Sequence, residues 1–423
     1  MKEELSDQAP PDRYKFVYFT FLFLGMGLLM PFNTLMTALD YFIVKLPGHD
    51  VDFIASILAN GPLFVFNLIM IIFSKYFPEK RTIGVTMMLM MAITLFLPFI
   101  PMVAGNNVET AWVIFIVSVL LLSSVNGMLQ CMLYGFTGSV PGNYIAPLNT
   151  GVGVSGIVIS VLRAISLIFF PTDSDPENPN FFKGSLMYFI IVSLILVLCT
   201  VMLTLLPRTE YYSYHMNQTR QQLDSASLEG EEQELALGNS EEESIIQNRE
   251  MNKGIFQYMW EVHNTVLITG YGLALVYTQT FCVFPGVFLQ AEIDFFENQS
   301  WEVWFAISLF NFADTAGRYA SELKVVLTEN TTAVATLLRF IPIAFAFLSA
   351  YDIPFFSHDV FKIANIILIG LSNGYVGNCQ MVVAVNNSRV RDKGITSMFM
   401  SVFLIFGVTV GSLIASFGIV RLF

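Results

Sequence analysis

An acid and a base lie one helical turn apart inside a long apolar stretch, in the segment Asn311-Phe-Ala-Asp314-Thr-Ala-Gly317-Arg318. If that stretch spans a bilayer, each charge at its centre costs roughly 2.5–3.5 kcal/mol on insertion scales, so the two charges require a partner, a water-filled cavity or a function. At this i, i+4 spacing the Asp314 carboxylate and the Arg318 guanidinium share one helix face. We therefore expect a polar site around Asp314 and Arg318.

The composition is that of a chain that lies mostly in a membrane. Of 423 residues, 55% are hydrophobic and 13% are charged, and the mean hydropathy is +0.63, whereas soluble domains carry about 25% charged residues. A bilayer core about 30 Å thick needs about 20 apolar residues per helix. This predicts an all-α polytopic membrane protein with eleven transmembrane helices, the first too long for a cleavable signal peptide. The helices are expected at 14–39, 53–74, 83–104, 111–136, 146–170, 184–206, 261–289, 301–323, 331–350, 361–385 and 395–420.

A polar segment divides these stretches six plus five. Residues 207–254 contain ten acidic and four basic side chains, and a segment of this composition cannot bury enough apolar surface to fold. We expect a first helical bundle over 1–206, an acidic disordered cytosolic loop over 207–259 and a second helical bundle over 260–423. Two bundles joined by a tether, with a substrate path between them, are typical of transporters.

The basic residues predict the orientation. With the N-terminus in the cytosol, fourteen of the 21 Lys and Arg residues fall inside and four outside, as the positive-inside rule requires. An odd number of spans then places the C-terminus outside, together with the sequon at Asn298, the candidate glycosylation site. We expect the plasma membrane. An endolysosomal membrane is the alternative, because the acidic run before Ile245-Ile246 is similar to an endosomal sorting signal.

The sequence gives little support to an enzyme. The four cysteines lie in apolar stretches and the four histidines have no ligand spacing, which argues against a metal site. The segment Gly370-Leu-Ser372-Asn-Gly374 matches the nucleophile-elbow pattern, yet it lies inside an apolar span with no strand before it. No phosphate-binding loop of the Gly-x4-Gly-Lys-Ser/Thr type is present. We expect no catalysis, no cofactor, no metal and no nucleic-acid partner.

Seven different short motifs are distributed along nearly the whole chain. In order they are Pro31-Phe32-Asn33, Leu129-Gln130, Ala146-Pro147, Leu206-Pro207-Arg208, Phe284-Pro285, Asn311-x-x-Asp314-x-x-Gly317-Arg318 and Leu371-Ser372-Asn373-Gly374-Tyr375. In this order and on these spans they resemble the equilibrative nucleoside transporter family. The first motif departs from the family's Pro-Trp-Asn, since Phe32 stands in place of the tryptophan. Phe32 keeps an aromatic ring but lacks the indole donor. The amine-carrying branch of the family has an acid after Thr-Gly in the fifth span, where this chain has Val152.

The resemblance implies a major-facilitator-like fold, with the eleven helices in a six-plus-five, two-bundle arrangement. It also implies facilitative, equilibrative and bidirectional transport of nucleosides, and in some members nucleobases, by alternating access. A proton-coupled nucleoside transporter of an acidic organelle is the alternative mechanism, and a receptor or scaffold is the alternative class. The implied partners are a nucleoside or nucleobase and the lipid bilayer, with the protein functional as a monomer.

The residues themselves fit a nucleoside, which is neutral and needs polar groups to replace the water that it loses in a pocket. Asp314 would accept ribose hydroxyls, while Arg318 keeps the carboxylate ionised. The alternative is a salt bridge that only locks its helix against the neighbouring helices. Arg163 and Arg339, also within spans, would make the cavity positive and repel organic cations.

Six more side chains complete the expected substrate site. Gln130 and Asn33 can pair with a base edge, although amides also hold membrane helices together at about 0.6 kcal/mol. Phe284 is a stronger candidate for a substrate contact than the other phenylalanines, because Pro285 beside it interrupts the helix and frees backbone groups that line cavities. The full set that joins Asp314 and Arg318 is Asn311, Gln130, Asn33, Phe32, Phe284 and Asn60.

Overall fold

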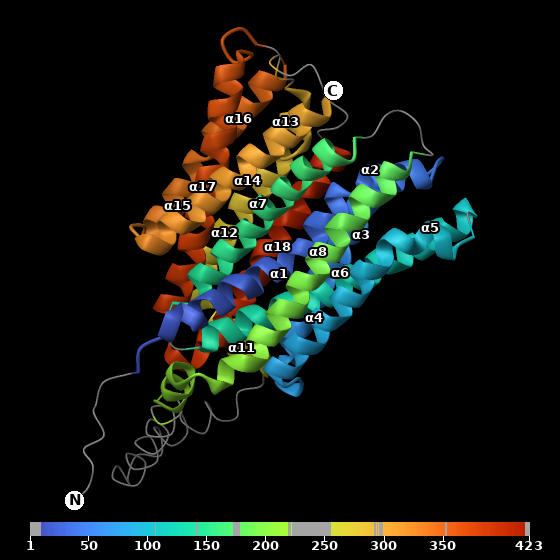
Figure 1. Ribbon diagram of the computed structural model, residues 1–423. Coiled ribbons are helices and arrows are strands. Elements are labelled where there is room, and N and C mark those ends of the chain that lie inside the picture. The colour runs from blue at the N-terminus through green and yellow to red at the C-terminus, as the bar shows by residue number, and fades with distance from the viewer. Residues whose placement is uncertain are drawn as a thin grey trace, which may run out of the picture.

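The structure is a computed structural model that describes residues 10–105, 107–140, 143–171, 178–218, 221, 255–291, 293, 295, 299–351 and 353–418. Within these residues all regular secondary structure is helical (Figure 1). The first half of the chain, through residue 218, forms α1 (Phe16–Thr37), α2 (Leu39–Lys45), α3 (Val51–Phe73), α4 (Glu79–Phe96), α5 (Ile100–Val103), α6 (Val108–Ser139), α7 (Ile145–Phe169) and α8 (Pro179–Leu205). The second half, from residue 255, forms α11 (Ile255–Thr265), α12 (Leu267–Val283), α13 (Gly286–Gln290), α14 (Gln299–Leu323), α15 (Glu329–Leu338), α16 (Phe340–Ala350), α17 (Asp359–Asn387) and α18 (Lys393–Phe417).

The described part of the chain contains ten helical segments long and apolar enough to cross a membrane. All eleven expected stretches coincide with helices, but α14, which occupies 301–323, is not among the ten. Four charged residues dilute its apolar character: Glu302, Asp314, Arg318 and Glu322. The prediction of a multi-span helical membrane protein is confirmed. The count of eleven spans stays a prediction, because it includes α14.

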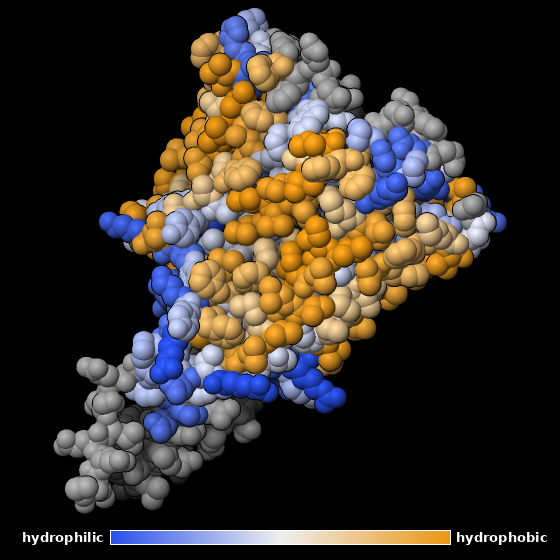
Figure 2. Space-filling model, in the orientation of Figure 1, coloured by the Kyte–Doolittle hydropathy of each residue, from blue (hydrophilic) through white to orange (hydrophobic). Residues whose placement is uncertain are grey.

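Two helix breaks within the expected stretches lie in the second half of the chain and bear on the site. The stretch 331–350 consists of α15 and α16, which meet at Arg339. In the stretch 261–289, α12 ends at Val283 and α13 begins at Gly286, so the interruption expected at Pro285 is present. Figure 2 shows the surface consequence of this helical assembly, a broad hydrophobic region across the middle of the molecule with hydrophilic residues gathered towards its ends.

Glycines bring helices of the same half into backbone contact. A Cβ added at Gly374 of α17 would overlap the carbonyl oxygen of Asp314 on α14, and one added at Gly317 of α14 would overlap the carbonyl oxygen of Leu371 on α17. Gly25 of α1 and Gly151 of α7 approach each other's helices in the same way. Small residues of this kind allow close approach of membrane helices, where hydrophobic burial gives no net driving force.

Between the two halves, glycines of α7 face side chains instead. A Cβ at Gly153 would come within 2.8 Å of the Thr315 hydroxyl, and one at Gly156 within 2.8 Å of the Asn311 amide carbon. On the α6 side, the Cβ of a substituted Gly135 would meet the side chain of Met398 on α18. The two halves therefore touch through movable side chains at these positions, whereas α14 and α17, and α1 and α7, touch through backbone.

The buried apolar core extends across the division between the halves. One cluster includes Leu24 and Leu129 from the first half and Leu273 and Phe403 from the second. A smaller cluster in the second half contains Phe288 and eight other residues. The two halves are packed against each other in this conformation.

The segment expected as a disordered loop over 207–259 has helical ends. Residues 210–218 are helical, and α11 begins at Ile255. The Tyr258 hydroxyl of α11 donates to Asp392 Oδ1 over 2.6 Å, and burial together with this carboxylate raises the pKa of Tyr258 to about 12. The middle of the segment, apart from residue 221, lies outside the described residues.

The glycine contacts predict a difference between two alanine substitutions. Gly374→Ala forces a Cβ into the backbone of α14, so we expect a loss of about 1–3 kcal/mol in stability, the usual cost of overpacking. Gly84→Ala on α4 meets no atom within 4 Å and should leave stability unchanged or raise it by up to about 1 kcal/mol through helix propensity. Thermal unfolding of both variants in the same detergent measures the difference. Equal melting temperatures would contradict the described contact between α14 and α17.

Candidate functional site

The centre of the site is the ion pair on α14. Arg318 Nε donates to Asp314 Oδ2 over 2.7 Å, and each residue is only 6% exposed. The contact predicted from the i, i+4 spacing is therefore present. Two opposite charges so deeply buried are stable only if hydrogen bonds satisfy their remaining donors and acceptors.

Those hydrogen bonds come from three other helices. Asn373 Nδ2 on α17 donates to Asp314 Oδ1 over 2.7 Å. Arg318 Nη1 donates to the carbonyl oxygen of Asn149 on α7 over 3.3 Å, and Arg318 Nη2 donates to the Tyr277 hydroxyl on α12 over 3.1 Å. The ion pair thus links the first half of the chain to two further helices of the second half.

The network continues through Asn149 to α6 and α17. The Tyr134 hydroxyl on α6 donates to Asn149 Oδ1 over 2.5 Å, and Asn149 Nδ2 donates to Asn378 Oδ1 over 2.8 Å. Asn378 Nδ2 in turn donates to the Ser321 hydroxyl on α14 over 2.8 Å. Sequence reasoning missed these residues, although buried amides inside apolar spans were a usable signal for Asn149 and Asn378.

Arg339 is a second buried cation attached to this network. It is 3% exposed, and among the described residues no carboxylate lies within salt-bridge distance of it. Its guanidinium donates to the Val276 carbonyl oxygen over 2.8 Å, the Thr280 hydroxyl over 2.7 Å and the Ser372 hydroxyl over 3.0 Å. Thr280 also lies 2.8 Å from Asn373 Oδ1, so Thr280 and Asn373 connect Arg339 to Asp314.

The expectation that Arg163, like Arg339, makes the central site positive was wrong. Arg163 Nη1 lies 2.9 Å from Asp40 Oδ2 on α2 and donates to the Tyr188 hydroxyl over 3.3 Å. Its side chain is 24% exposed, so the pair lies at the edge of the helical core. The described central cluster therefore contains one acid, Asp314, and two bases, Arg318 and Arg339, which gives it a formal charge of +1.

Two of the expected amides donate hydrogen bonds to α7. Asn33 Nδ2 donates to the Ser155 hydroxyl over 3.0 Å. Asn311 Nδ2 donates to the Ser160 hydroxyl over 3.2 Å and lies 3.4 Å from the Gly156 carbonyl oxygen. Both side chains join helices in this conformation, as intramembrane amides commonly do.

Gln130 is placed differently. It is 5% exposed and makes no hydrogen bond with the rest of the described chain. Tyr134 follows it by one turn of α6, so both side chains lie on one face of the helix. Gln130 therefore lies near the network through Tyr134 while its amide keeps its hydrogen-bonding capacity.

Three expected side chains and the glycosylation candidate remain. Phe32 lines a void of about 10 Å³ between α1, α3 and α6, together with Ala59 and Asn126. Asn60 is buried on α3. Phe284 stacks on Phe310 with ring centroids 4.2 Å apart, and Phe310 precedes Asp314 by one turn of α14. The glycosylation candidate Asn298 lies outside the described residues.

Comparison with solved structures defines the fold. The chain superimposes on the proton:xylose symporter XylE of the major facilitator superfamily with a TM-score of 0.65 at 9% identity, covering 97% of this chain and 90% of that one. It superimposes on the major facilitator superfamily transporter FucP in its outward conformation with a TM-score of 0.58 at 15% identity, covering 94% and 90%. The fold is that of a major facilitator superfamily transporter.

Sequence comparison gives the family. The model of the nucleoside transporter family matches residues 116–420. Equilibrative nucleotide transporter 1 of Arabidopsis thaliana is 24% identical over 432 residues, covering 99% of this chain and 89% of the relative. Human equilibrative nucleoside transporter 1 is 23% identical over 461 residues, covering 96% and 97%.

These findings define a class and a family in turn. The matching family model and the named relatives are transporters, and together with the major facilitator fold they identify the chain as a membrane transporter and not an enzyme. The family match covers most of its length, and the chain belongs to the nucleoside transporter family. The resemblance inferred from the sequence motifs is confirmed.

The link between Arg339 and Asn373 predicts the effect of one substitution. Thr280→Val keeps the shape of the side chain but removes an acceptor from Arg339 and the hydroxyl beside Asn373. A hydrogen bond to a charged group is worth about 1.5–3 kcal/mol, so we expect uptake of labelled uridine to fall about tenfold or more. Thr269→Val is the matched control, because Thr269 is buried on the same helix and its hydroxyl donates to the carbonyl oxygen of Val266, the residue just before that helix. Equal uptake by the two variants would exclude a role for Thr280 in the site.

Proposed function

We propose that this protein carries nucleosides, and nucleobases as a second substrate class, downhill and in both directions across the membrane by alternating access. The observation that supports this most directly is the buried Asp314 carboxylate, held in a fixed orientation by Arg318 and Asn373. A carboxylate offers about four lone-pair positions, so two protein donors leave capacity for ribose hydroxyls. The names of the relatives, which include human equilibrative nucleoside transporters 1 and 2, agree with this substrate.

In this proposal α14 is the eighth of eleven spans, arranged six plus five. A helix of 25 residues is about 37 Å long, enough to cross a bilayer core. In Figure 1 the first residues of α1 and the last residues of α18 lie towards opposite ends of the molecule, as an odd number of spans requires. We place the N-terminus in the cytosol and the C-terminus outside the cell, with the plasma membrane as the site of action and the monomer as the functional unit.

Alternating access requires contacts between the halves that can be exchanged. Several contacts between the halves in this structure are single hydrogen bonds between polar side chains. The Thr150 hydroxyl on α7 donates to Glu322 Oε2 on α14 over 2.8 Å, and the Ser401 hydroxyl on α18 donates to Asn67 Oδ1 on α3 over 3.2 Å. Water or substrate can replace such bonds, because a neutral one is worth only about 1 kcal/mol and one to a carboxylate about 1.5–3 kcal/mol.

The charge of the site favours a neutral substrate. The cluster around Asp314 has a formal charge of +1, which disfavours organic cations. Gln130 supplies an amide for the edge of a base, and the carboxylate of Asp314 is paired with Arg318 rather than alone, which argues against proton coupling. A proton-coupled cycle is the outcome that the transport experiment below must exclude.

The substrate role of Asp314 predicts that Asp314→Asn abolishes uptake. A neutral amide cannot both accept ribose hydroxyls and compensate the charge of Arg318, and breaking a buried ion pair costs about 3–5 kcal/mol. We expect uptake of labelled adenosine and uridine to fall at least about 100-fold. Arg318→Lys should retain part of the activity, because the charge remains but the planar fork that reaches Asn149 and Tyr277 does not.

Loss of folding must be separated from loss of binding. The double variant Asp314→Asn/Arg318→Gln removes both charges and should recover much of the thermal stability that Asp314→Asn loses, yet remain inactive. Surface expression and a monodisperse elution profile provide the control. Normal uptake by a folded Asp314→Asn variant would refute the proposed site.

The energetics are tested in vesicles that contain the purified protein and do not metabolise nucleosides. Preloading with unlabelled nucleoside should accelerate entry of labelled substrate, and the steady internal concentration of labelled adenosine, uridine or hypoxanthine should equal the external one. An inward proton gradient should change the initial rate little and the final level not at all. Accumulation above the external concentration under that gradient would establish the proton-coupled mechanism instead.

A further inference from the structure

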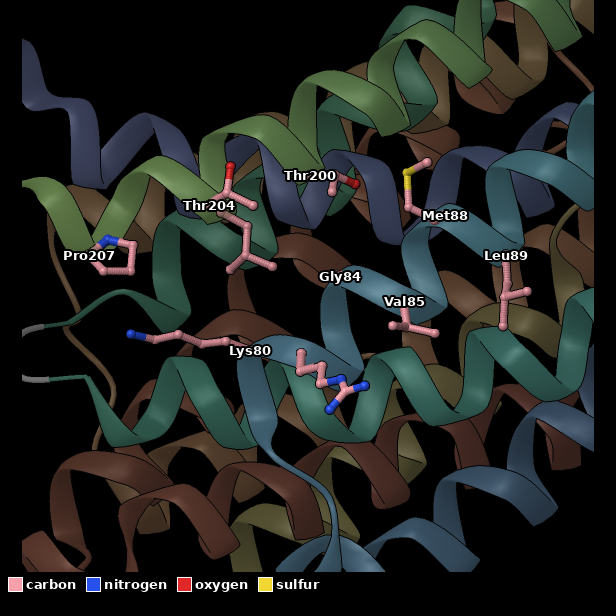
Figure 3. A pocket seen from close by; sticks show the side chains of 10 residues that line it. Lys80, Gly84, Val85, Met88, Leu89, Thr200, Thr204 and Pro207 are labelled. Carbon is pink, nitrogen blue, oxygen red and sulfur yellow. The ribbon is translucent and has the colours of Figure 1, made fainter.

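A groove on the outside of the helical assembly is separate from the central network. It lies between α4 and α8, has a volume of about 630 Å³ and is lined by Lys80, Arg81, Gly84, Val85, Met88, Leu89, Thr200, Leu203, Thr204 and Pro207. Figure 3 shows Thr200, Thr204 and Pro207 on one side, facing Lys80, Gly84, Val85 and Leu89 on the other. Both walls belong to segments that can span the membrane, so the groove faces the lipid.

The floor of the groove is open because Gly84 has no side chain. A Cβ built at Gly84 meets no atom within 4 Å, in contrast to the tightly packed glycines of α1, α7, α14 and α17. The hydroxyls of Thr200 and Thr204 donate to the carbonyl oxygens of Leu196 and Val201 on their own helix. The walls therefore present apolar surface along two turns of α4, which suits a hydrocarbon chain.

Two basic residues stand at one end of this apolar groove. The Lys80 ammonium lies 4.6 Å from the centre of the Tyr212 ring and 5.9 Å from that of Phe136, which fixes it near the groove. Arg81 is exposed and forms no ion pair with the described acids. Its planar guanidinium is suited to bidentate contact with a phosphate group.

We propose that the groove between α4 and α8 is a binding site for one anionic phospholipid of the leaflet on the N-terminal side of the membrane. The headgroup phosphate binds Arg81 in the field of Lys80, and one acyl chain lies over Gly84 between Val85, Leu89 and Thr200. Basic pockets between membrane helices bind acidic headgroups on the same physical grounds. A nucleoside is a poor occupant, because the lining offers few donors or acceptors and opens to the hydrocarbon.

The test compares two photoreactive lipids on the purified full-length protein. Phosphatidylserine and phosphatidylcholine, each with the same diazirine-labelled acyl chain, are illuminated in separate samples, and the adducts are mapped by peptide mass spectrometry. We expect phosphatidylserine to label peptides covering 84–89 and 200–204 about fivefold more than phosphatidylcholine, since one basic residue near an anionic headgroup is worth about 1 kcal/mol. This comparison needs no variant.

Three variants separate headgroup from chain. Arg81→Gln should reduce phosphatidylserine labelling to the phosphatidylcholine level. Gly84→Leu, which fills the floor, should reduce the labelling by both lipids. Lys324→Gln is the charge control, because Lys324 is an exposed base just after α14 in the other half of the chain, and its labelling pattern should match that of the unaltered protein.

Equal labelling by the two lipids in the unaltered protein would overturn the proposal and identify the groove as ordinary lipid contact. Preferential labelling that survives Arg81→Gln would overturn the assignment of the headgroup site. Neither outcome bears on nucleoside uptake, which depends on the separate network around Asp314.

Discussion

The buried ion pair between Asp314 and Arg318 imposes requirements on the helices around it. Removing two charges from water is costly, and their attraction offsets that cost only when every remaining donor and acceptor is satisfied. Asn373, Asn149 and Tyr277 meet this requirement from α17, α7 and α12. Asn373 reaches the carboxylate because Gly374 and Gly317 let α17 and α14 come into backbone contact. The glycines therefore serve the electrostatics as well as the packing.

The sequence predicts best what is local along the chain. The pairing of Asp314 with Arg318 follows from their spacing on one helix, and the helix break at Pro285 follows from the chemistry of proline. The partners of Arg163 and Asn33, namely Asp40 and Ser155, could not be inferred, because each is more than 100 residues away in the sequence. Spacing places a side chain on a face of its own helix but does not identify the helix that this face meets.

The same limit explains the error about Arg163 and the partners that the amides have in this structure. Arg163 and Arg339 look alike as single bases within apolar stretches, yet one pairs with a carboxylate at the edge of the core and the other is held by neutral oxygens at its centre. Asn311 follows the periodicity of α14, but the close approach of α7 at Gly156 gives it a nearer partner. The low hydropathy of α14 has a different cause. The charged residues of the site lie on this helix, so the helix is less apolar than the ten clear spans.

The two kinds of glycine contact have a mechanical consequence. Between α14 and α17, and between α1 and α7, backbone contacts backbone. No side chain at these contacts can change rotamer, so each pair of helices is rigid. Where glycine meets the end of a side chain, as at Gly156 and Asn311 or Gly135 and Met398, a rotation about one or two bonds is enough to change the fit. If the two halves move relative to each other, as the proposed transport cycle requires, the side chains at these positions can adjust while the backbone contacts within α14/α17 and α1/α7 stay unchanged.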